Sequence, residues 1–387
     1  MILPKIVFII NQLNYGGAEK SLLYLAKLIN KEKFDITVFT VHDGGDLEQE
    51  FTKLGIKIKN PYSCALSANN IVLKSINHLL IKRIERMVHT NSVHLLKAAT
   101  GEDYDIVVSY HVDSSCYAAG FPKKGKHIKY IHADLANSPS YVNDNKYLFN
   151  LKTPYDKVIG VSSIAQAGYH KVFGKNGSSA VLLNPIDSEE INQLSTENSV
   201  NLPKESYICA LGRLTKEKGF ARLIDVYAKL KENAFPHKLV IMGEGPEADN
   251  LQKKICDYKM EDLVILMGHQ SNPYPVIKNS KFLIVPSYSE GLSMTAMEAI
   301  CLGIPVVSTC PSVGDILGDE PCGIITENSD DALYEGMRKM SDEIFFHQAK
   351  QAAERRSRFF DGRKMAERVE NMYLDILNET KDSEEIC

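Results

Sequence analysis

The sequence predicts an α/β fold of two domains, each built on a parallel sheet covered by helices. Short apolar runs of strand length alternate along the chain with segments of helical apolar spacing, which is typical of parallel sheets. The chain has 387 residues, of which 44% are apolar, so it is long enough for two substantial cores. A polar stretch with little periodicity follows Asn184 and Pro185, and we therefore expect domains over 1–187 and 188–360.

The first domain is predicted to begin with a strand, a loop and a helix. The apolar run over 5–10 ends at a polar loop that contains Gly16 and Gly17, and apolar residues then recur at three- and four-residue steps over 21–29. The run is too short for a secretory signal and lacks a small-residue cleavage pattern. The two glycines allow the backbone to approach a ligand without a side-chain clash.

A histidine follows another predicted strand of the first domain. Ile128 and Tyr130 alternate with polar residues, and His132 lies at the end of this segment. A lone histidine there is more often a hydrogen-bonded structural residue than a catalyst, and the chain has ten others. The position by itself leaves both interpretations open.

Two carboxylates mark a predicted strand-to-helix turn in the second domain. An apolar strand over 282–285 ends at Pro286, and apolar residues at helical spacing follow until Gly303. In an open parallel sheet the loops at the carboxyl ends of strands line the ligand crevice, so Glu290 is expected beside a ligand. Glu298 follows about two helical turns later. The alternative is that both glutamates are solvated helix residues.

The start of the same helix suits an anion. The main-chain N–H groups of Gly291, Leu292 and Ser293 precede the first helical turn, where unpaired donors favour a phosphate. A carboxylate that reads sugar hydroxyls beside such a helix end suggests a nucleotide-sugar.

A basic turn follows an earlier strand of the second domain. The strand-like run over 207–211 leads directly into a turn that carries Arg213 and Lys218. Arginine offers a planar fork of donors and lysine a mobile point charge, a pair suited to a diphosphate. A solvated basic turn is the alternative.

Together these stretches resemble the donor-binding half of retaining GT-B glycosyltransferases of family 4, the glycosyl transferases group 1. The resemblance runs in order through GRLTKEKG, VIMGEGPE, MGH, FLIVPS, EGLSMTAMEA and GIPVVST. It implies two Rossmann-like domains that face each other across a cleft. It also implies that a C-terminal helix over 361–379 crosses back and completes the first domain.

The resemblance assigns roles to the residues singled out above. His132 and Glu290 become catalytic residues, Glu290 by contact with the transferred hexose, while Glu298 bonds the ribose hydroxyls. Arg213 and Lys218 hold the donor diphosphate. The residues implied to bind the donor are Gly16, Gly17, Arg213, Lys218, Gly243, Gly291, Leu292, Ser293 and Glu298.

Two other motifs point to different chemistry. Gly243, Gly245 and Ala248 match a dinucleotide-binding pattern, but Glu244 places a negative charge where pyrophosphate would lie and Pro246 lacks an amide donor.

The second motif is Asp103-Tyr104-Asp105, which mimics the DxD metal motif of a different glycosyltransferase fold. It stands before a predicted strand of the first domain, away from the donor elements. We therefore expect no cofactor and no metal requirement, with Arg213 and Lys218 stabilising the leaving diphosphate electrostatically.

Composition limits the partners and the compartment. The net charge of -4 argues against a general nucleic-acid binder, and no apolar run approaches the ~20 residues of a membrane span. Eight cysteines without a CxxC pair indicate buried free thiols in a reducing compartment, the cytoplasm. The segment 71–99 has helical apolar spacing with bases between, so it is either a peripheral contact with anionic membrane or an ordinary domain helix.

The predicted function is transfer of a hexose or N-acetylhexosamine from a nucleotide-diphosphate sugar, by family frequency a UDP-sugar, with retention of configuration. The resemblance implies a saccharide or lipid-linked saccharide acceptor in bacterial surface polysaccharide synthesis. Two alternatives stay open: a nucleotide-sugar epimerase or hydrolase of the same fold, and a non-catalytic subunit that binds the sugar nucleotide.

Overall fold

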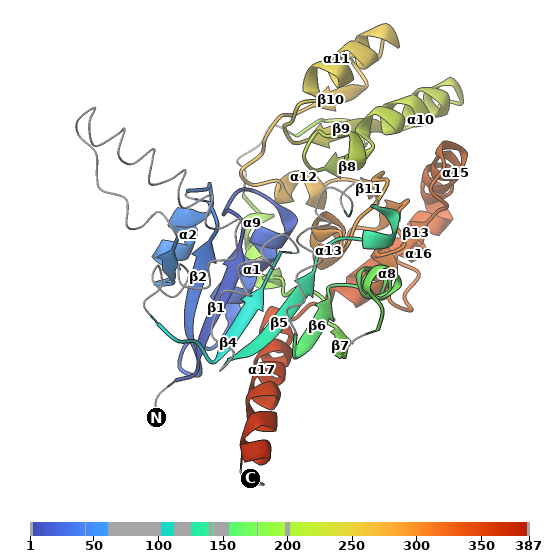
Figure 1. Cartoon of the computed structure of the whole chain (residues 1–387). Helices are drawn as coiled ribbons and strands as arrows, with labels where there is room; N and C mark the ends of the chain where they lie inside the picture. The colour runs from blue at the N-terminus through green and yellow to red at the C-terminus, as the bar shows by residue number, and fades with distance from the viewer. Residues whose placement is uncertain are drawn as a thin grey trace, which may run out of the picture. The chain divides into compact units, whose positions relative to one another are not determined.

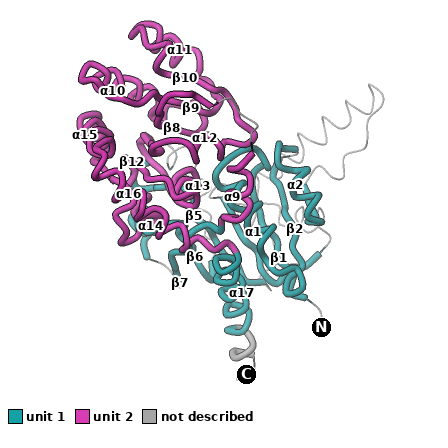
Figure 2. Tube along the Cα trace, turned by 180° about the vertical axis from the view of Figure 1, so that it is seen from behind, with its two compact units in different colours: residues 1–185, 363–387 teal, residues 186–362 magenta. Residues whose placement is uncertain are grey.

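The computed structural model describes residues 3–42, 44–60, 102–111, 125–138, 142, 155–175, 177–197 and 202–384. The chain divides into two compact units (Figure 2). Unit 1 comprises residues 1–185 and 363–387, and unit 2 comprises residues 186–362. The boundaries predicted from the sequence, after 187 and after 360, each differ from these by two residues.

Unit 1 contains a parallel sheet, which over the described residues has seven strands in the order β3-β2-β1-β4-β5-β6-β7 (Figure 1). The strand order reverses direction between β1 and β4, so this is a doubly wound sheet whose switch point lies at these two strands. The strands are β1 Lys5–Ile10, β2 Asp35–Thr40, β3 Lys57–Lys59, β4 Ile106–Ser109, β5 Lys126–Ile131, β6 Lys157–Gly160 and β7 Ser178–Val181.

The helices described in unit 1 are α1 Gly17–Leu28, α2 Glu48–Lys53, the short 3-10 helix η1 Leu135–Asn137, α8 Ser163–Phe173 and α17 Gly362–Glu384. Helix α1 begins four residues before the predicted start at residue 21. Gly16 is its extended N-cap, and its carbonyl accepts a 2.9 Å hydrogen bond from the Lys20 N–H. The sequence pattern missed this first turn because its residues are small or polar and carry no apolar periodicity.

Helix α17 packs on the sheet of unit 1, although it follows unit 2 in the sequence. The fully buried Tyr373 ring lies 6.3 Å from Phe8 and 6.2 Å from Phe34, measured between ring centroids. The Glu370 carboxylate on the same helix accepts hydrogen bonds from the Asn30 N–H and from Lys33, each at 2.8 Å. Aromatic packing and a buried carboxylate thus tie the C-terminal helix to β1 and to the segment after α1.

Unit 2 contains a second parallel sheet, which over the described residues has six strands in the order β10-β9-β8-β11-β12-β13. Its switch point lies between β8 and β11. The strands are β8 Tyr207–Leu211, β9 Lys238–Met242, β10 Val264–Leu266, β11 Leu283–Val285, β12 Val306–Ser308 and β13 Gly323–Ile325.

Helices cover the second sheet. One core joins buried side chains of α10, α11 and α15 to inward residues of the strands, such as Ile208, Ile241 and Ile284. The helical segments described are α9 Ser188–Leu194, η2 Lys216–Lys218, α10 Phe220–Glu232, α11 Ala248–Asp257, α12 Tyr274–Lys278, α13 Met294–Cys301, α14 Val313–Leu317, α15 Asp330–Met340 and α16 Glu343–Ser357.

Three predictions from composition concern the membrane, the basic segment and the cysteines. In the described part of the chain, no helix has the length and apolar character needed to span a membrane. The segment 71–99, predicted to be a basic amphipathic surface, lies outside the described residues. Of the described cysteines, Cys209, Cys301, Cys310 and Cys322 are buried free thiols, whereas Cys256 is exposed.

Candidate functional site

The residues predicted to bind a diphosphate lie at the switch point of the second sheet. Arg213 and Lys218 follow β8, and Glu290 follows β11, the strand that pairs with β8. In open α/β sheets ligands bind beside the carboxyl ends of the strands where the order reverses. The sheet topology therefore brings together residues that are more than 70 positions apart in the sequence.

Lys218 and Glu290 form an ion pair. The Lys218 Nζ lies 2.7 Å from the Glu290 Oε1. The Ser287 hydroxyl donates to the same carboxylate oxygen at 2.8 Å. Both charged side chains are partly buried, so the contact orients them before any ligand arrives. Sequence reasoning did not include Ser287, although it stands at the end of β11, three residues before Glu290.

Arg213 offers a second positive charge in the same loop. It is exposed, and its guanidinium has no hydrogen-bond or ion-pair partner among the residues that the structure describes. An arginine in this state can turn its planar fork of donors to an incoming oxyanion without first giving up another contact.

A glycine that sequence reasoning did not list shapes this loop. Gly219 follows Lys218 with a left-handed φ of +69°. A Cβ atom added there would lie 2.1 Å from the carbonyl oxygen of Pro286. Only glycine fits, because the turn after Lys218 presses directly on the main chain after β11. The turn pair Lys-Gly was the available signal for this residue.

Gly243 supports the loop after β8 from its other side. Its φ is +138°, and an added Cβ would lie 1.9 Å from the Gly212 carbonyl oxygen. Gly245 makes the same kind of close approach, with an added Cβ 2.5 Å from the Leu214 carbonyl oxygen. The glycines of the dinucleotide-like pattern thus allow two loops of unit 2 to pack together, which explains the pattern without a pyrophosphate.

The start of α13 lies beside Glu290. Ser293 is the N-cap, and its hydroxyl accepts a 3.3 Å hydrogen bond from the Ala296 N–H. Its side chain is therefore used by the helix, so that an anion would meet Ser293, like Gly291 and Leu292, through main-chain N–H groups.

Glu298 lies on α13 and is only 1% exposed. A carboxylate at such depth needs hydrogen-bonding partners. Burial raises the pKa of the nearby Cys301 thiol, and the charge of Glu298 raises it further.

A second set of predicted site residues follows the carboxyl ends of strands in the first sheet. Gly16 and Gly17 follow β1 and begin α1, whereas His132 follows β5. The His132 ring is stacked on Tyr130 with centroids 6.0 Å apart, and it lies 4.7 Å from the Tyr110 ring. Its Nε2 atom is enclosed and has no hydrogen-bond partner within the described part of the chain.

The surroundings of His132 favour the neutral imidazole. Burial, and to a smaller extent the neighbouring His111, hold the pKa of His132 well below its usual range. The ring is therefore uncharged at neutral pH, and one of its nitrogens can accept a proton or a hydrogen bond.

Two further residues at this edge were missed by sequence reasoning. The His111 Nε2 lies 3.6 Å from the Glu19 Oε1, and the two histidine rings have centroids 6.2 Å apart. The Glu19 carboxylate adjoins the glycine pair, since a Cβ added to Gly16 would lie 2.1 Å from the Glu19 Oε2. His111 follows β4 as His132 follows β5, and this parallel was the signal available in the sequence.

The DxD-like motif lies at the other edge of the first sheet. Asp105 precedes β4, and its Oδ2 accepts a 2.7 Å hydrogen bond from the Lys5 N–H. This carboxylate serves the amino ends of two strands. Over the described residues, no group of three or more His, Cys, Asp or Glu side chains is placed to hold a metal ion.

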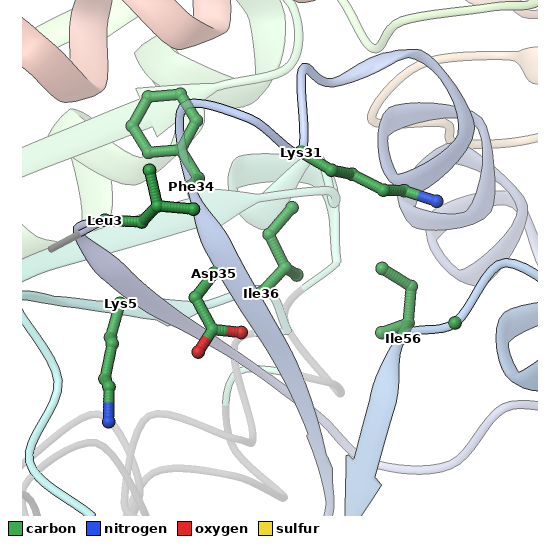
Figure 3. A pocket seen from close by; sticks show the side chains of 8 residues that line it. Leu3, Lys5, Lys31, Phe34, Asp35, Ile36 and Ile56 are labelled. Atoms are coloured by element: carbon green, nitrogen blue, oxygen red, sulfur yellow. The ribbon is translucent and has the colours of Figure 1, made fainter. Parts of the chain in front are cut away.

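A pocket of about 340 Å³ lies at this amino edge, beside β1 and β2 (Figure 3). Its charged residues are already engaged: Lys5 pairs with Glu102, and Asp35 pairs with Lys57. The Lys31 ammonium donates to the Leu54 carbonyl oxygen at 2.6 Å. Because its polar groups are satisfied and the sheet presents its amino ends here, we do not assign the predicted chemistry to this pocket.

Two family models match the chain in succession. Residues 15–190 match Glycosyltransferase Family 4, and residues 193–356 match Glycosyl transferases group 1. The first match lies almost entirely in unit 1, and the second lies within unit 2. The chain belongs to the GT-B glycosyltransferases of family 4, group 1.

Curated relatives include two enzymes of Campylobacter jejuni. One is an N-acetylgalactosamine-N,N'-diacetylbacillosaminyl-diphospho-undecaprenol 4-alpha-N-acetylgalactosaminyltransferase, 33% identical over 48% of this chain. The match spans about half (51%) of the length of that relative. The other is a GalNAc-alpha-(1->4)-GalNAc-alpha-(1->3)-diNAcBac-PP-undecaprenol alpha-1,4-N-acetyl-D-galactosaminyltransferase, 24% identical over 98% of this chain and 99% of the relative.

Solved structures share the fold. Anabaena Alr3699/HepE in complex with UDP-glucose has a TM-score of 0.72 at 18% identity, and the match covers 98% of this chain and 99% of that one. The pneumococcal O-GlcNAc transferase GtfA in complex with UDP and GlcNAc has a TM-score of 0.71 at 13% identity, with 97% and 100% coverage. At these identities the likeness establishes the GT-B fold.

Proposed function

We propose that the chain transfers a hexose or N-acetylhexosamine from a UDP-sugar to a saccharide or lipid-linked saccharide acceptor, with retention of configuration, in the synthesis of a bacterial surface glycan. The observation that carries this proposal is the Lys218–Glu290 ion pair with the exposed Arg213 in the same loop. The UDP complexes of structural neighbours and the undecaprenol-linked substrates named for the C. jejuni relatives support it.

The diphosphate is the natural ligand of the two cations. When it arrives, Lys218 exchanges its carboxylate partner for a phosphate oxygen, and Arg213 adds a bidentate contact. Positive charge fixed at this place stabilises the negative charge that develops on the leaving diphosphate. Because two cations already supply this stabilisation, we propose that transfer needs no metal ion.

The two glutamates have different tasks. Glu290, released from Lys218, accepts hydrogen bonds from hydroxyls of the transferred sugar, whereas Glu298 bonds the ribose hydroxyls. Retention follows if the diphosphate leaves from the face on which the acceptor hydroxyl arrives and its own oxygen accepts the proton. The neutral His132 then acts near the sugar by hydrogen bonding, so that His132→Ala lowers turnover and Glu298→Ala weakens nucleotide binding.

The first test is thermal unfolding of the protein with UDP, GDP, ADP, CMP and NAD, with the Arg213→Ala/Lys218→Ala variant beside it. At about a hundredfold excess over Kd, a ligand that binds only the native state adds roughly 2.7 kcal/mol of stability. We expect an upshift with UDP that the double variant loses. An upshift with NAD alone, or one that the double variant retains, contradicts the proposal.

Turnover separates the remaining alternatives. Transfer of radiolabelled sugar from the donor to a lipid-linked acceptor in the presence of EDTA is the expected result. Release or interconversion of the sugar without an acceptor would instead indicate a hydrolase or epimerase, and donor binding without any turnover would indicate a non-catalytic subunit.

A further inference from the structure

We infer that Arg222 and Asn328 position the loop that carries Glu290, and that they do so by clamping Tyr288. Neither residue contacts Lys218 or Glu290 in the interactions described above. The inference deepens the proposed function and rests on it, because it assigns residues that hold the diphosphate-binding pair in place.

Arg222 is a buried cation on α10. It is only 4% exposed, and its Nη1 donates to the Asn328 Oδ1 at 2.6 Å. Its Nε lies 3.9 Å from the Asp330 Oδ1, too far for a hydrogen bond. Nε and Nη2 have no hydrogen-bond partner among the described residues. A buried guanidinium with two unsatisfied donors costs free energy, so packing alone does not account for an arginine here.

Tyr288 is the residue on which this cation rests. The Arg222 guanidinium carbon lies 4.5 Å from the centroid of the Tyr288 ring, and Tyr288 is 52% exposed. A guanidinium over an aromatic ring attracts it electrostatically. The buried Arg222 therefore holds the side chain of Tyr288, although Tyr288 itself lies at the surface.

The main chain of Tyr288 is held on both sides. Its N–H donates to the Glu217 carbonyl oxygen at 2.9 Å, and its own carbonyl oxygen accepts from the Asn328 Nδ2 at 2.7 Å. Glu217 belongs to the loop after β8, and Asn328 to the loop after β13. Asn328 thus uses its two amide atoms to join Arg222 to the Tyr288 main chain.

These contacts decide where the ion pair forms. Glu217 directly precedes Lys218, and Tyr288 lies between Ser287 and Glu290, the two residues that meet at 2.8 Å. Fixing Tyr288 to Glu217 therefore fixes the loop of Glu290 against the loop of Lys218. Small displacements of positioning groups lower rates strongly, so a loosened loop should weaken both donor binding and turnover.

Arg356 provides a matched control in the same unit. Its guanidinium carbon lies 4.0 Å from the Phe359 ring, and its Nε donates to the Ile316 carbonyl oxygen at 2.7 Å. It resembles Arg222 in stacking and in hydrogen bonding, but its partners lie on α14 and in the segment after α16 rather than in the loops after β8 and β11. For Asn328 the control is Asn279, whose Nδ2 donates to the Pro275 carbonyl oxygen at 2.8 Å.

The test compares Arg222→Lys and Asn328→Ala with Arg356→Lys and Asn279→Ala. UDP affinity is measured by calorimetry, donor kcat and KM by turnover, and stability by thermal unfolding. We expect the first two variants to lose UDP affinity about fivefold or more and kcat/KM about tenfold or more. Their melting temperatures should match those of their controls, which should keep the UDP affinity of the parent protein.

A double-variant cycle tests the route through Tyr288. If Arg222 acts through this ring, Arg222→Lys combined with Tyr288→Leu should bind UDP no more weakly than the weaker single variant. Losses that multiply would overturn the inference, and so would parental UDP affinity in both Arg222→Lys and Asn328→Ala. Failure of the parent protein itself to bind any nucleoside diphosphate would instead overturn the proposed function.

Discussion

At the residue scale, the ion pair between Lys218 and Glu290 explains how one site can hold a cation and a carboxylate side by side before any ligand binds. The pair neutralises both groups in the free protein, at 2.7 Å, and keeps each near its proposed ligand. An arriving diphosphate competes with Glu290 for Lys218. Loss of Lys218 should therefore weaken diphosphate binding, whereas loss of Glu290 should keep or strengthen this binding and lower turnover.

Replacement of the pair one member at a time tests this competition. Lys218→Gln should weaken UDP binding about 10- to 100-fold, which corresponds to about 1.5–3 kcal/mol for a charged hydrogen bond. Glu290→Gln should bind UDP as tightly as the parent or tighter, because Lys218 loses its competitor, yet its kcat should fall about 100-fold or more. Calorimetry and turnover assays separate the two effects. Weaker UDP binding by Glu290→Gln would contradict the competition.

A second residue-scale prediction concerns Gly219. Gly219→Ala and Gly268→Ala both place a side chain at a left-handed φ, +69° and +67°, but only Gly219 has main chain within reach of the new Cβ. Gly268→Ala should cost about 1–2 kcal/mol of unfolding free energy, the strain of the conformation itself. Gly219→Ala should cost more and also abolish UDP binding. Denaturant unfolding with and without UDP measures the stability and the UDP binding of each variant. Equal losses of unfolding free energy in the two variants would show that the loop around Gly219 adjusts to the added methyl group.

At the element scale, one buried carboxylate fastens helix α17 in addition to its aromatic packing. Glu370 is fully buried and receives hydrogen bonds from the Asn30 N–H, Lys33 and Arg363. Burial alone would raise the pKa of Glu370, but these three donors together hold it below the usual value of 4.5. The charged form is therefore the one that fastens the helix to unit 1.

Neutralising this carboxylate should loosen the helix. Glu370→Gln should lower the unfolding free energy by about 1–3 kcal/mol, since two of its three donors belong to partly exposed cations. Because the folded state lowers the pKa, this stabilisation is present above pH ~4.5 and is lost as the pH falls through the folded pKa. Denaturant unfolding from pH 7 to 3 should show the loss in the parent and not in the variant.

The surface residue Glu367 on the same helix is the control. It pairs with Arg363 at 3.4 Å but is half exposed, so Glu367→Gln should change the unfolding free energy by less than about 0.5 kcal/mol. If Glu370→Gln behaves like Glu367→Gln, the buried carboxylate does not hold the helix.

At the scale of the whole molecule, unit 2 is one continuous segment, whereas unit 1 is assembled from two. Residues 186–362 carry a complete sheet and their own core, together with Arg213, Lys218, Glu290 and Glu298. The geometry proposed for the diphosphate uses residues of this unit alone.

The isolated segment 186–362 should therefore fold and bind UDP. We expect native-like circular dichroism and an upward shift of the melting temperature with UDP that Arg213→Ala/Lys218→Ala removes. A folded segment without UDP binding would mean that the first unit contributes to the diphosphate site. Sugar transfer should be absent, because His132 belongs to the other unit.

Much of this organisation could be predicted from local patterns. Short apolar runs placed β8 and β11 correctly, and turn residues placed Lys218 and Glu290 at strand ends, where parallel sheets bind ligands. Resemblance to the family added roles that spacing could not supply. The first turn of α1 was missed since Gly16, Gly17 and Ala18 carry no periodic signal.

The sequence by itself determined the fold class, the family and the strand ends that carry the charged residues, because these depend on short-range periodicity and on motifs read in order. Only the tertiary structure decided that Lys218 meets Glu290, that Gly219 presses on Pro286, and that Arg222 reaches Asn328 across 106 positions. Such pairings depend on which strands lie side by side. That order is set by the packing of the whole sheet, and no single position in the sequence reveals it.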